Sequence, residues 1–192
     1  FVADHGDMLG DHHLWRKTYA YEGSAAIPFI VKLPKDTESK LKPGKPIEAP
    51  VELRDLLPTF LAINHQPVPR EMDGLSLLPL LENGEAPWRK YIDIEHSTAY
   101  WADNYWCALT DGKIKYIWFF RTGEEQLFNL VEDPHEQHDL SKTAAAGKQL
   151  DAMRKAMAEH LEERGEEWVK DGKLVIRQQN LLYSPNYPTN KK

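Results

Sequence analysis

The sequence predicts an α/β fold, in which the end of an α/β domain is followed by a small antiparallel β-sheet packed with a C-terminal helix. Three observations lead to this prediction. An apolar run over residues 27–33, closed by Pro34, is typical of a buried strand in an α/β sheet. Short apolar segments separated by turn residues begin at residue 91 and predict strands. An amphipathic segment over residues 148–164 predicts a helix.

Two short helices are expected in the first half of the chain, after a polar loop over residues 35–50. Asp55 stands where it can cap the first of these helices. The apolar residues of that helix would share one face, and they are Leu56, Leu57, Phe60 and Leu61. The second helix is expected over residues 74–81.

An antiparallel meander is expected in the second half. The predicted strands cover residues 91–95, 105–109, 113–120 and 126–130. Gly165 follows the terminal helix at the natural C-cap position. We therefore predict two domains: the C-terminal part of an α/β domain over residues 1–88, and an antiparallel-sheet subdomain with a terminal helix and tail over residues 89–192.

The composition excludes several classes of function. The chain has 192 residues, with 30 acidic against 24 basic side chains and a formal net charge of −6. This balance argues against nucleic acid or an anionic membrane as a partner, because both need a positive field. No apolar run approaches the ~20 residues that a membrane span requires. Cys107 is the only cysteine, which rules out an internal disulfide framework.

The segment from Asp4 to Lys17 is the densest in chemically active residues. It follows Phe1-Val2-Ala3, which is typical of the end of a strand already under way, so we expect a C-terminal piece of a longer protein. Loops after strand ends are where open α/β sheets bind ligands. Asp4 and His5 offer a carboxylate oxygen and an imidazole nitrogen to a metal. Lys17 lies twelve positions past His5 and could fold back to hold an anionic oxygen. An incidental polar loop is the alternative.

Several motifs occur together in the order that one enzyme family carries. They cover residues 1–17, 21–23, 27–30, 55–60, 73–79, 109–116 and 126–136. Together they resemble type I sulfatases of the alkaline-phosphatase-like superfamily, over roughly residues 1–165. The resemblance implies that the first domain is the C-terminal part of an alkaline-phosphatase-like α/β domain with a catalytic role.

The resemblance also assigns roles to single residues. Asp4 matches the carboxylate ligand of a divalent metal, for which Ca²⁺ is expected, and His5 matches the next ligand. Lys17 matches the lysine that contacts the sulfate group, and His12 is a lesser catalytic candidate. Ala3 departs from the commoner Ser or Thr, at a position that is not a ligand.

The nucleophile of the family is absent from this chain. It is a formylglycine made in a Cys/Ser-x-Pro-x-Arg motif, which the sequence does not contain. Cys107 lacks the Pro and the Arg and is expected to be a core residue. We therefore expect the formylglycine upstream, in the missing N-terminal half of the protein, and expect the fragment alone to be inactive.

The expected function is hydrolysis of sulfate monoesters, with a small-molecule or saccharide sulfate ester as substrate. The alternatives are a phosphonate or phosphate monoester hydrolase of the same superfamily and a catalytically inactive sugar-binding relative. His96, Tyr100 and Trp101 could line a substrate subsite, although a satisfied structural loop is the simpler explanation. Residues 133–140 resemble a structural turn rather than a metal cluster. A periplasmic or secreted location is expected, with the signal outside this chain.

Overall fold

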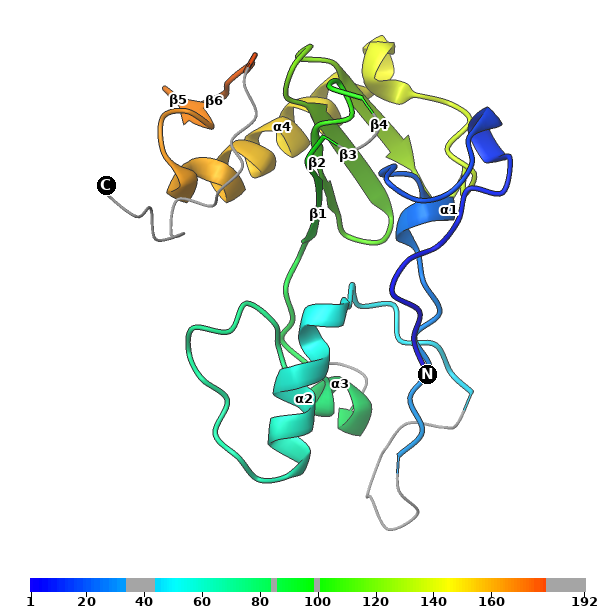
Figure 1. Cartoon of the computed structure of the whole chain (residues 1–192), viewed down its shortest axis with the longest axis vertical. Coiled ribbons are helices and arrows are strands. Elements are labelled where there is room, and N and C mark those ends of the chain that lie inside the picture. Colours follow the sequence, from blue (N-terminus) through cyan, green and yellow to red (C-terminus); the bar gives the residue numbers. More distant parts are fainter. Residues whose placement is uncertain (34–43, 84–85, 99–100, 179–192) are drawn as a thin grey trace. The chain divides into compact units, whose positions relative to one another are not determined.

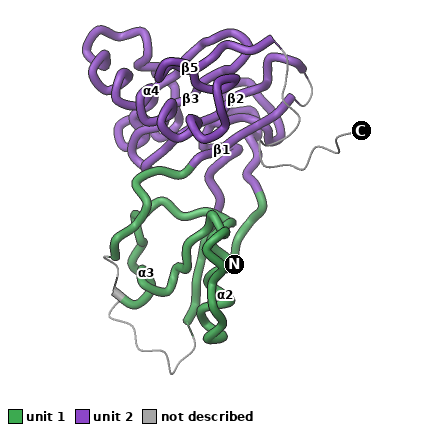
Figure 2. The backbone as a smooth tube through the Cα atoms, turned by 90° about the vertical axis from the view of Figure 1, so that its left-hand side faces the viewer, with its two compact units in different colours: residues 1–4, 28–92 green, residues 5–27, 93–192 purple. Residues whose placement is uncertain are grey.

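The computed structural model describes residues 1–33, 44–83, 86–98 and 101–178 (Figure 1). The chain divides into two compact units (Figure 2). One contains residues 1–4 and 28–92, and the other contains residues 5–27 and 93–192. The predicted boundary between residues 88 and 89 concerns the domains of a longer fold and stays a prediction.

The first unit contains two helices, α2 (Leu56–Ile63) and α3 (Leu78–Asn83). Its buried centre is small and consists of Leu77, Leu80 and Leu81 on and before α3. Partly buried apolar side chains pack around this centre, among them Phe29, Ile47, Val51 and Trp88. Both helices lie close to their predicted positions, although α3 begins later than expected.

The prediction of a buried strand over residues 27–33 is wrong, because these residues form only one isolated bridge. One isolated antiparallel bridge joins Phe29 to Val2, and Ile30 is 62% exposed. The backbone N–H of Ile30 donates to the carbonyl of Phe1 at 2.8 Å. A buried strand of an α/β sheet needs partner strands at its edges and cover on both faces. The described part of the first unit supplies only residues 1–4 as a partner, so the apolar run forms no strand.

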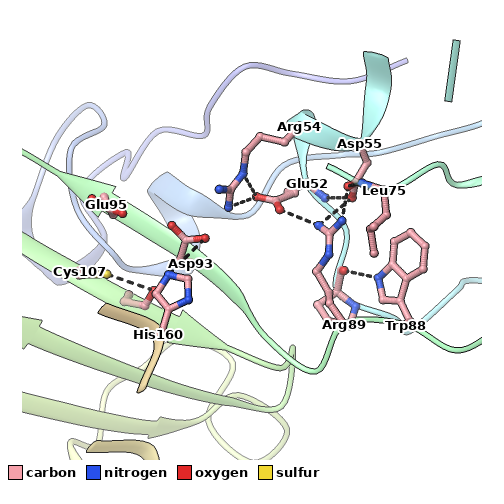
Figure 3. A network of polar contacts seen from close by, with 12 residues as sticks. Glu52, Arg54, Asp55, Leu75, Trp88, Arg89, Asp93, Glu95, Cys107 and His160 are labelled. Atoms are coloured by element: carbon pink, nitrogen blue, oxygen red, sulfur yellow. Dashed lines mark hydrogen bonds and ion pairs between the residues drawn. The ribbon is translucent and has the colours of Figure 1, made fainter. Parts of the chain in front are cut away.

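The sequence analysis expected the Asp55 side chain to cap α2, but this side chain makes no capping hydrogen bond to that helix. Its carboxylate is fully buried and accepts hydrogen bonds from the backbone N–H groups of Glu52 and Leu75, at 3.0 and 2.8 Å. The guanidinium of Arg89 pairs with both carboxylates, those of Glu52 and Asp55 (Figure 3). A buried carboxylate needs such partners, because burial of an unpaired charge costs several kcal/mol or more. This network therefore joins the start of α2 to residues 75 and 89.

The second unit contains the antiparallel meander that the sequence predicts. Four strands form one sheet in the order β1 (Ile92–His96), β2 (Trp106–Thr110), β3 (Ile114–Phe119), β4 (Glu125–Asn129). The pairings of β3 with β2 and with β4 are antiparallel, and Tyr116 lies opposite both Leu109 and Leu127. The unit also contains the short helix α1 (Glu22–Ala25) and the terminal helix α4 (Gly147–Leu161).

The end of α4 agrees with the sequence prediction. The helix passes into a 3₁₀ turn over Glu162–Arg164, and Gly165 follows with a φ of 94°, a conformation that favours glycine. The hairpin of β5 (Val169–Lys170) and β6 (Lys173–Leu174) comes next and was not predicted. None of the helices described for this chain has the length and apolarity to cross a membrane.

The main sheet is covered on both faces, since every residue of β2 is buried. Helix α4 contacts β2 and β3 and covers one face (Figure 1). The other face packs Ile117 and Phe128 against Ala20 and Tyr21, which follow the Asp4–Lys17 segment in the sequence. Lys115 belongs to this second face, because side chains two residues apart on a strand point the same way. The meander thus supports the segment that the sequence analysis singled out.

Candidate functional site

Residues 5–18 form a closed loop whose two arms are hydrogen bonded to each other. The backbone N–H of Met8 donates to the carbonyl of Arg16 at 2.9 Å. The Asp7 carboxylate accepts from the backbone N–H groups of Leu9 and Arg16, at 2.9 and 3.0 Å. Because Arg16 lies beside Asp7 and Met8, its neighbour Lys17 returns toward the start of the loop. The sequence analysis allowed for such a return, and a contact of Lys17 with an anionic oxygen at the metal stays a prediction.

The backbone of this loop is strained. Five residues other than glycine have φ between 47° and 92°, and they are Leu9, His12, His13, Arg16 and Thr18. Each such conformation costs of order 1–3 kcal/mol and persists where the surroundings fix it. Clusters of strained residues occur at active sites and ligand clamps. No pattern in the sequence indicated this strain.

Asp4 and His5 are consecutive and exposed. The Nδ1 of His5 lies 2.7 Å from the carbonyl oxygen of Gly6 and donates to it, because a carbonyl only accepts. This tautomer puts the lone pair on Nε2, which is the form of imidazole that binds a metal. The chemistry of these two residues therefore fits a divalent cation. No three His, Cys, Asp or Glu side chains among the described residues are grouped to hold one, so further ligands would have to come from elsewhere.

His12, the lesser catalytic candidate, is held against other parts of the second unit. Its ring stacks on Tyr21 with centroids 4.1 Å apart, and its Nε2 lies 2.9 Å from the carbonyl oxygen of His135. Burial raises the pKa of Tyr21, whose hydroxyl donates to Gln126. Through these contacts, His12 supports the structure of the loop. Lys17, in contrast, is exposed.

Two of the candidate substrate residues, His96 and Trp101, have contacts that lead to the end of the loop. Trp101 is 45% exposed, and the centroid of its ring lies 5.8 Å from that of Tyr19. His96, the last residue of β1, donates through Nδ1 to the carbonyl of Asn104 at 2.9 Å. Tyr100 lies outside the described residues.

Two polar side chains that the sequence analysis did not single out join this region to the loop. The Asn104 amide donates to the Thr18 hydroxyl at 3.2 Å. The indole N–H of Trp106 donates to the Thr18 carbonyl at 3.2 Å. Trp101, Asn104 and Trp106 thus contact Thr18 and Tyr19, which directly follow Lys17. No sequence pattern indicates this contact, because 86 residues separate Asn104 from Thr18.

Cys107 lies fully buried in β2, as expected of a core residue. Glu136 is also buried, in the turn after β4, where it contacts Lys115. Burial raises the pKa of Glu136, while the Lys115 ammonium acts in the opposite direction. The sequence analysis took this turn as structural but did not anticipate the buried ion pair.

Residues 10–166 match the family described as N-sulphoglucosamine sulphohydrolase, C-terminal. The match covers most of the chain, and the chain belongs to this family. The predicted resemblance to sulfatases is confirmed, as is the predicted fold class.

Three known proteins show the extent of the likeness. An arylsulfatase of Clostridium perfringens (strain 13 / Type A) is 40% identical over 175 residues, which are 91% of this chain and 36% of that protein. A structure solved in complex with its substrate D-glucosamine-2-N,6-O-disulfate has a TM-score of 0.69 and 25% identity, over 84% of this chain and 33% of that chain. A phosphonate monoester hydrolase from Silicibacter pomeroyi has a TM-score of 0.69 and 29% identity, over 84% and 34%. The chain therefore spans about a third of the length of each relative.

Proposed function

We propose that the full-length protein is a sulfatase, and that this chain supplies part of its metal and sulfate site. One observation carries the proposal: a strained, closed loop presents His5 and Lys17 at the surface of a chain that is 40% identical to an arylsulfatase over 175 residues. Strain of this kind costs free energy and is kept where a site needs a fixed geometry.

Each residue of the site has a chemical role in this proposal. Asp4 and His5 would hold a divalent cation, with Ca²⁺ as the expected ion, and the cation would offset negative charge on the sulfate oxygens. The ammonium of Lys17 would bind one sulfate oxygen as a point charge. A formylglycine from upstream residues would supply the nucleophilic oxygen. His12 would keep the tip of the loop against Tyr21, and a direct catalytic role for it stays a prediction.

The proposed substrate is a small-molecule or saccharide sulfate ester. The substrate named for one similar structure, D-glucosamine-2-N,6-O-disulfate, supports the saccharide class. The contact of Trp101 with Tyr19 supports a place for the organic part of the substrate next to Lys17. A periplasmic or secreted location belongs to the same proposal.

A phosphonate or phosphate monoester hydrolase is the second candidate, and the likeness to the phosphonate monoester hydrolase favours it. A sulfate monoester carries one negative charge, whereas a phosphate monoester carries nearly two and usually recruits two metals. The segment from Asp4 to Lys17 offers one metal-binding pair, Asp4 and His5, and one ammonium, that of Lys17. These groups fit the single negative charge of a sulfate monoester. A sugar-binding relative without catalysis is the third candidate, and loss of the upstream nucleophile would indicate it.

Parallel kinetics test the proposal. The full-length protein would be assayed on an aryl sulfate, the matching aryl phosphate and the matching aryl phosphonate, at one pH and one metal concentration. We expect the highest kcat/KM on the sulfate. Asp4→Ala protein purified in the same way reports any contaminating hydrolase. Preference for the phosphate or phosphonate would establish the second candidate, and no turnover above this control would establish the third.

A further inference from the structure

Lys115 is a fully buried ammonium on β3 with three acceptors. Its Nζ donates to the carbonyl of Ala20 at 2.8 Å and to the carboxylates of Glu136 and Glu22, at 2.8 and 2.6 Å. Three N–H donors thus meet three oxygens. An apolar side chain at such a position often gives equal or greater stability, because burial of an ion pair costs desolvation energy. Stability alone therefore does not account for the cluster.

Glu136 uses both of its carboxylate oxygens in this cluster. One accepts from Lys115, and the other accepts from the backbone N–H of Glu22 at 2.6 Å. Glu136 itself has a φ of 53°, which is a costly backbone conformation, and its side chain is buried. The cluster consequently joins three parts of the second unit: strand β3, the turn after β4 and the start of α1.

The site loop rests on α1 in turn. The backbone N–H of Gly6 donates to the carbonyl of Ser24 at 2.9 Å. A Cβ at Gly6 would lie 2.2 Å from the carbonyl oxygen of Gly23, so the two backbones are in direct contact. Met8 is buried and packs its sulfur against Gly23. The backbone next to His5 is thus clamped onto the short helix that Lys115 and Glu136 hold.

We propose that Lys115 and Glu136 are positioning residues, which act through α1 to hold the strained loop of residues 5–18 in its active geometry. They do not touch the proposed metal or substrate. Their effect on turnover rests on the proposed function, whereas their effect on the order of the loop does not.

Two variants test this inference in the full-length protein. Glu136→Gln keeps the volume but replaces the oxygen that accepts from Glu22 or the one that accepts from Lys115 with an amide NH₂. The double variant Lys115→Met/Glu136→Leu replaces the ion pair with apolar groups and leaves no charge at these two positions. The Glu22 carboxylate loses its contact with Lys115 in this variant, but its side chain is 35% exposed and can bind water. Arg154→Met is the matched control, because it breaks the ion pair with Glu125 on the opposite face of the same sheet.

Amide hydrogen exchange is the first readout, since it measures local opening separately from activity. In both variants we expect exchange in peptides over residues 5–25 to be faster by about tenfold or more, with peptides over β2 and β3 unchanged. The control should leave peptides over residues 5–25 unchanged. Unchanged exchange of these peptides in both variants, or equal acceleration in the loop and the sheet, would overturn the inference.

Turnover of an aryl sulfate is the second readout. We expect kcat of the double variant to fall by about tenfold or more while KM changes less, because misplaced groups act on the transition state. A mobile loop with wild-type kcat would also overturn the inference. If the wild type does not hydrolyse sulfate esters, the proposed function fails, and the exchange experiment still decides whether the cluster positions the loop.

Discussion

Asp4 and His5 are the two residues on which the metal proposal depends. We expect Asp4→Ala and His5→Ala in the full-length protein to lower the bound divalent cation and to abolish turnover, because each removes a ligand of the type that such a cation requires. Metal analysis of the purified variants measures this. His138→Ala, at an exposed histidine of the turn after β4, serves as the control and should keep full metal content. Full occupancy by the divalent cation in both Asp4→Ala and His5→Ala would contradict the assignment of these residues as metal ligands.

Single residues differ in how far the sequence alone indicates their role. Asp4, His5 and Lys17 could be found from the sequence because their types and spacing match a family pattern. Lys115 and Asp55 could not be recognised as buried, since charged residues are rarely fully buried without partners. Their partners Glu136 and Arg89 lie 21 and 34 residues away in the sequence, and no sequence pattern indicates those ion pairs.

At the scale of elements, the contact between the loop and α1 can be tested at Gly6. A Cβ there would collide with the Gly23 carbonyl, so Gly6→Ala must displace one backbone from the other. We expect kcat/KM on an aryl sulfate to fall by about tenfold or more, since a shift of ~1 Å in catalytic groups can cost that much. Gly147→Ala is the control, because no atom beyond its chain neighbours and its own helix backbone lies within 4 Å of the added Cβ, and alanine favours the helix. Wild-type kinetics for Gly6→Ala would show that this contact does not matter for the site.

The contact of Glu125 with Arg154 of α4 predicts how the stability of the fold depends on pH. Burial acts to raise the pKa of Glu125, but hydrogen bonds from Arg154 and Tyr116 outweigh burial and lower it below its ordinary value. A carboxyl group with a lowered pKa in the folded state stabilises the fold above its unfolded pKa, and this stabilisation is lost as the pH falls through the folded pKa.

Thermal unfolding of Glu125→Gln tests this sign. The variant should have a lower Tm than the wild type at pH 7, and the difference should shrink as the pH falls below about 4, near the ordinary pKa of a glutamate. The control Glu159→Gln alters an exposed i,i+4 pair with Lys155 and should change little at any pH. A difference in Tm between Glu125→Gln and wild type that is independent of pH would contradict the assignment.

Elements with local signals were predicted well. The four strands and α4 follow from alternation, helical periodicity and turn residues, and the structure confirms them within a few residues. The apolar run over residues 27–33 was misjudged, because a strand depends on its neighbours as well as on its own residues. The apolar face expected on the first helix is likewise more exposed than predicted, with Leu57 55% and Phe60 56% exposed.

For the whole molecule, the proposed reaction requires residues beyond this chain. We expect residues 1–192, expressed alone, to show no sulfatase activity, because the sequence contains no Cys/Ser-x-Pro-x-Arg motif and Cys107 is buried. An aryl sulfate assay of the purified chain beside the full-length protein measures this. Turnover by the chain alone, at a level that Asp4→Ala removes, would show that it holds a complete site.

The kinetics of Lys17→Ala show whether the loop of residues 5–18 binds a sulfate group. Lys17→Ala in the full-length protein would be compared with Lys155→Ala, at an exposed lysine of α4, on an aryl sulfate and the matching aryl phosphate. We predict that Lys17→Ala lowers kcat/KM on the sulfate by about tenfold or more, or ~1.4 kcal/mol of transition-state stabilisation. Lys155→Ala should match the wild type, and the wild type should prefer the sulfate. Unchanged kinetics for Lys17→Ala, or a wild-type preference for the phosphate, would contradict the claim that this loop binds a sulfate group.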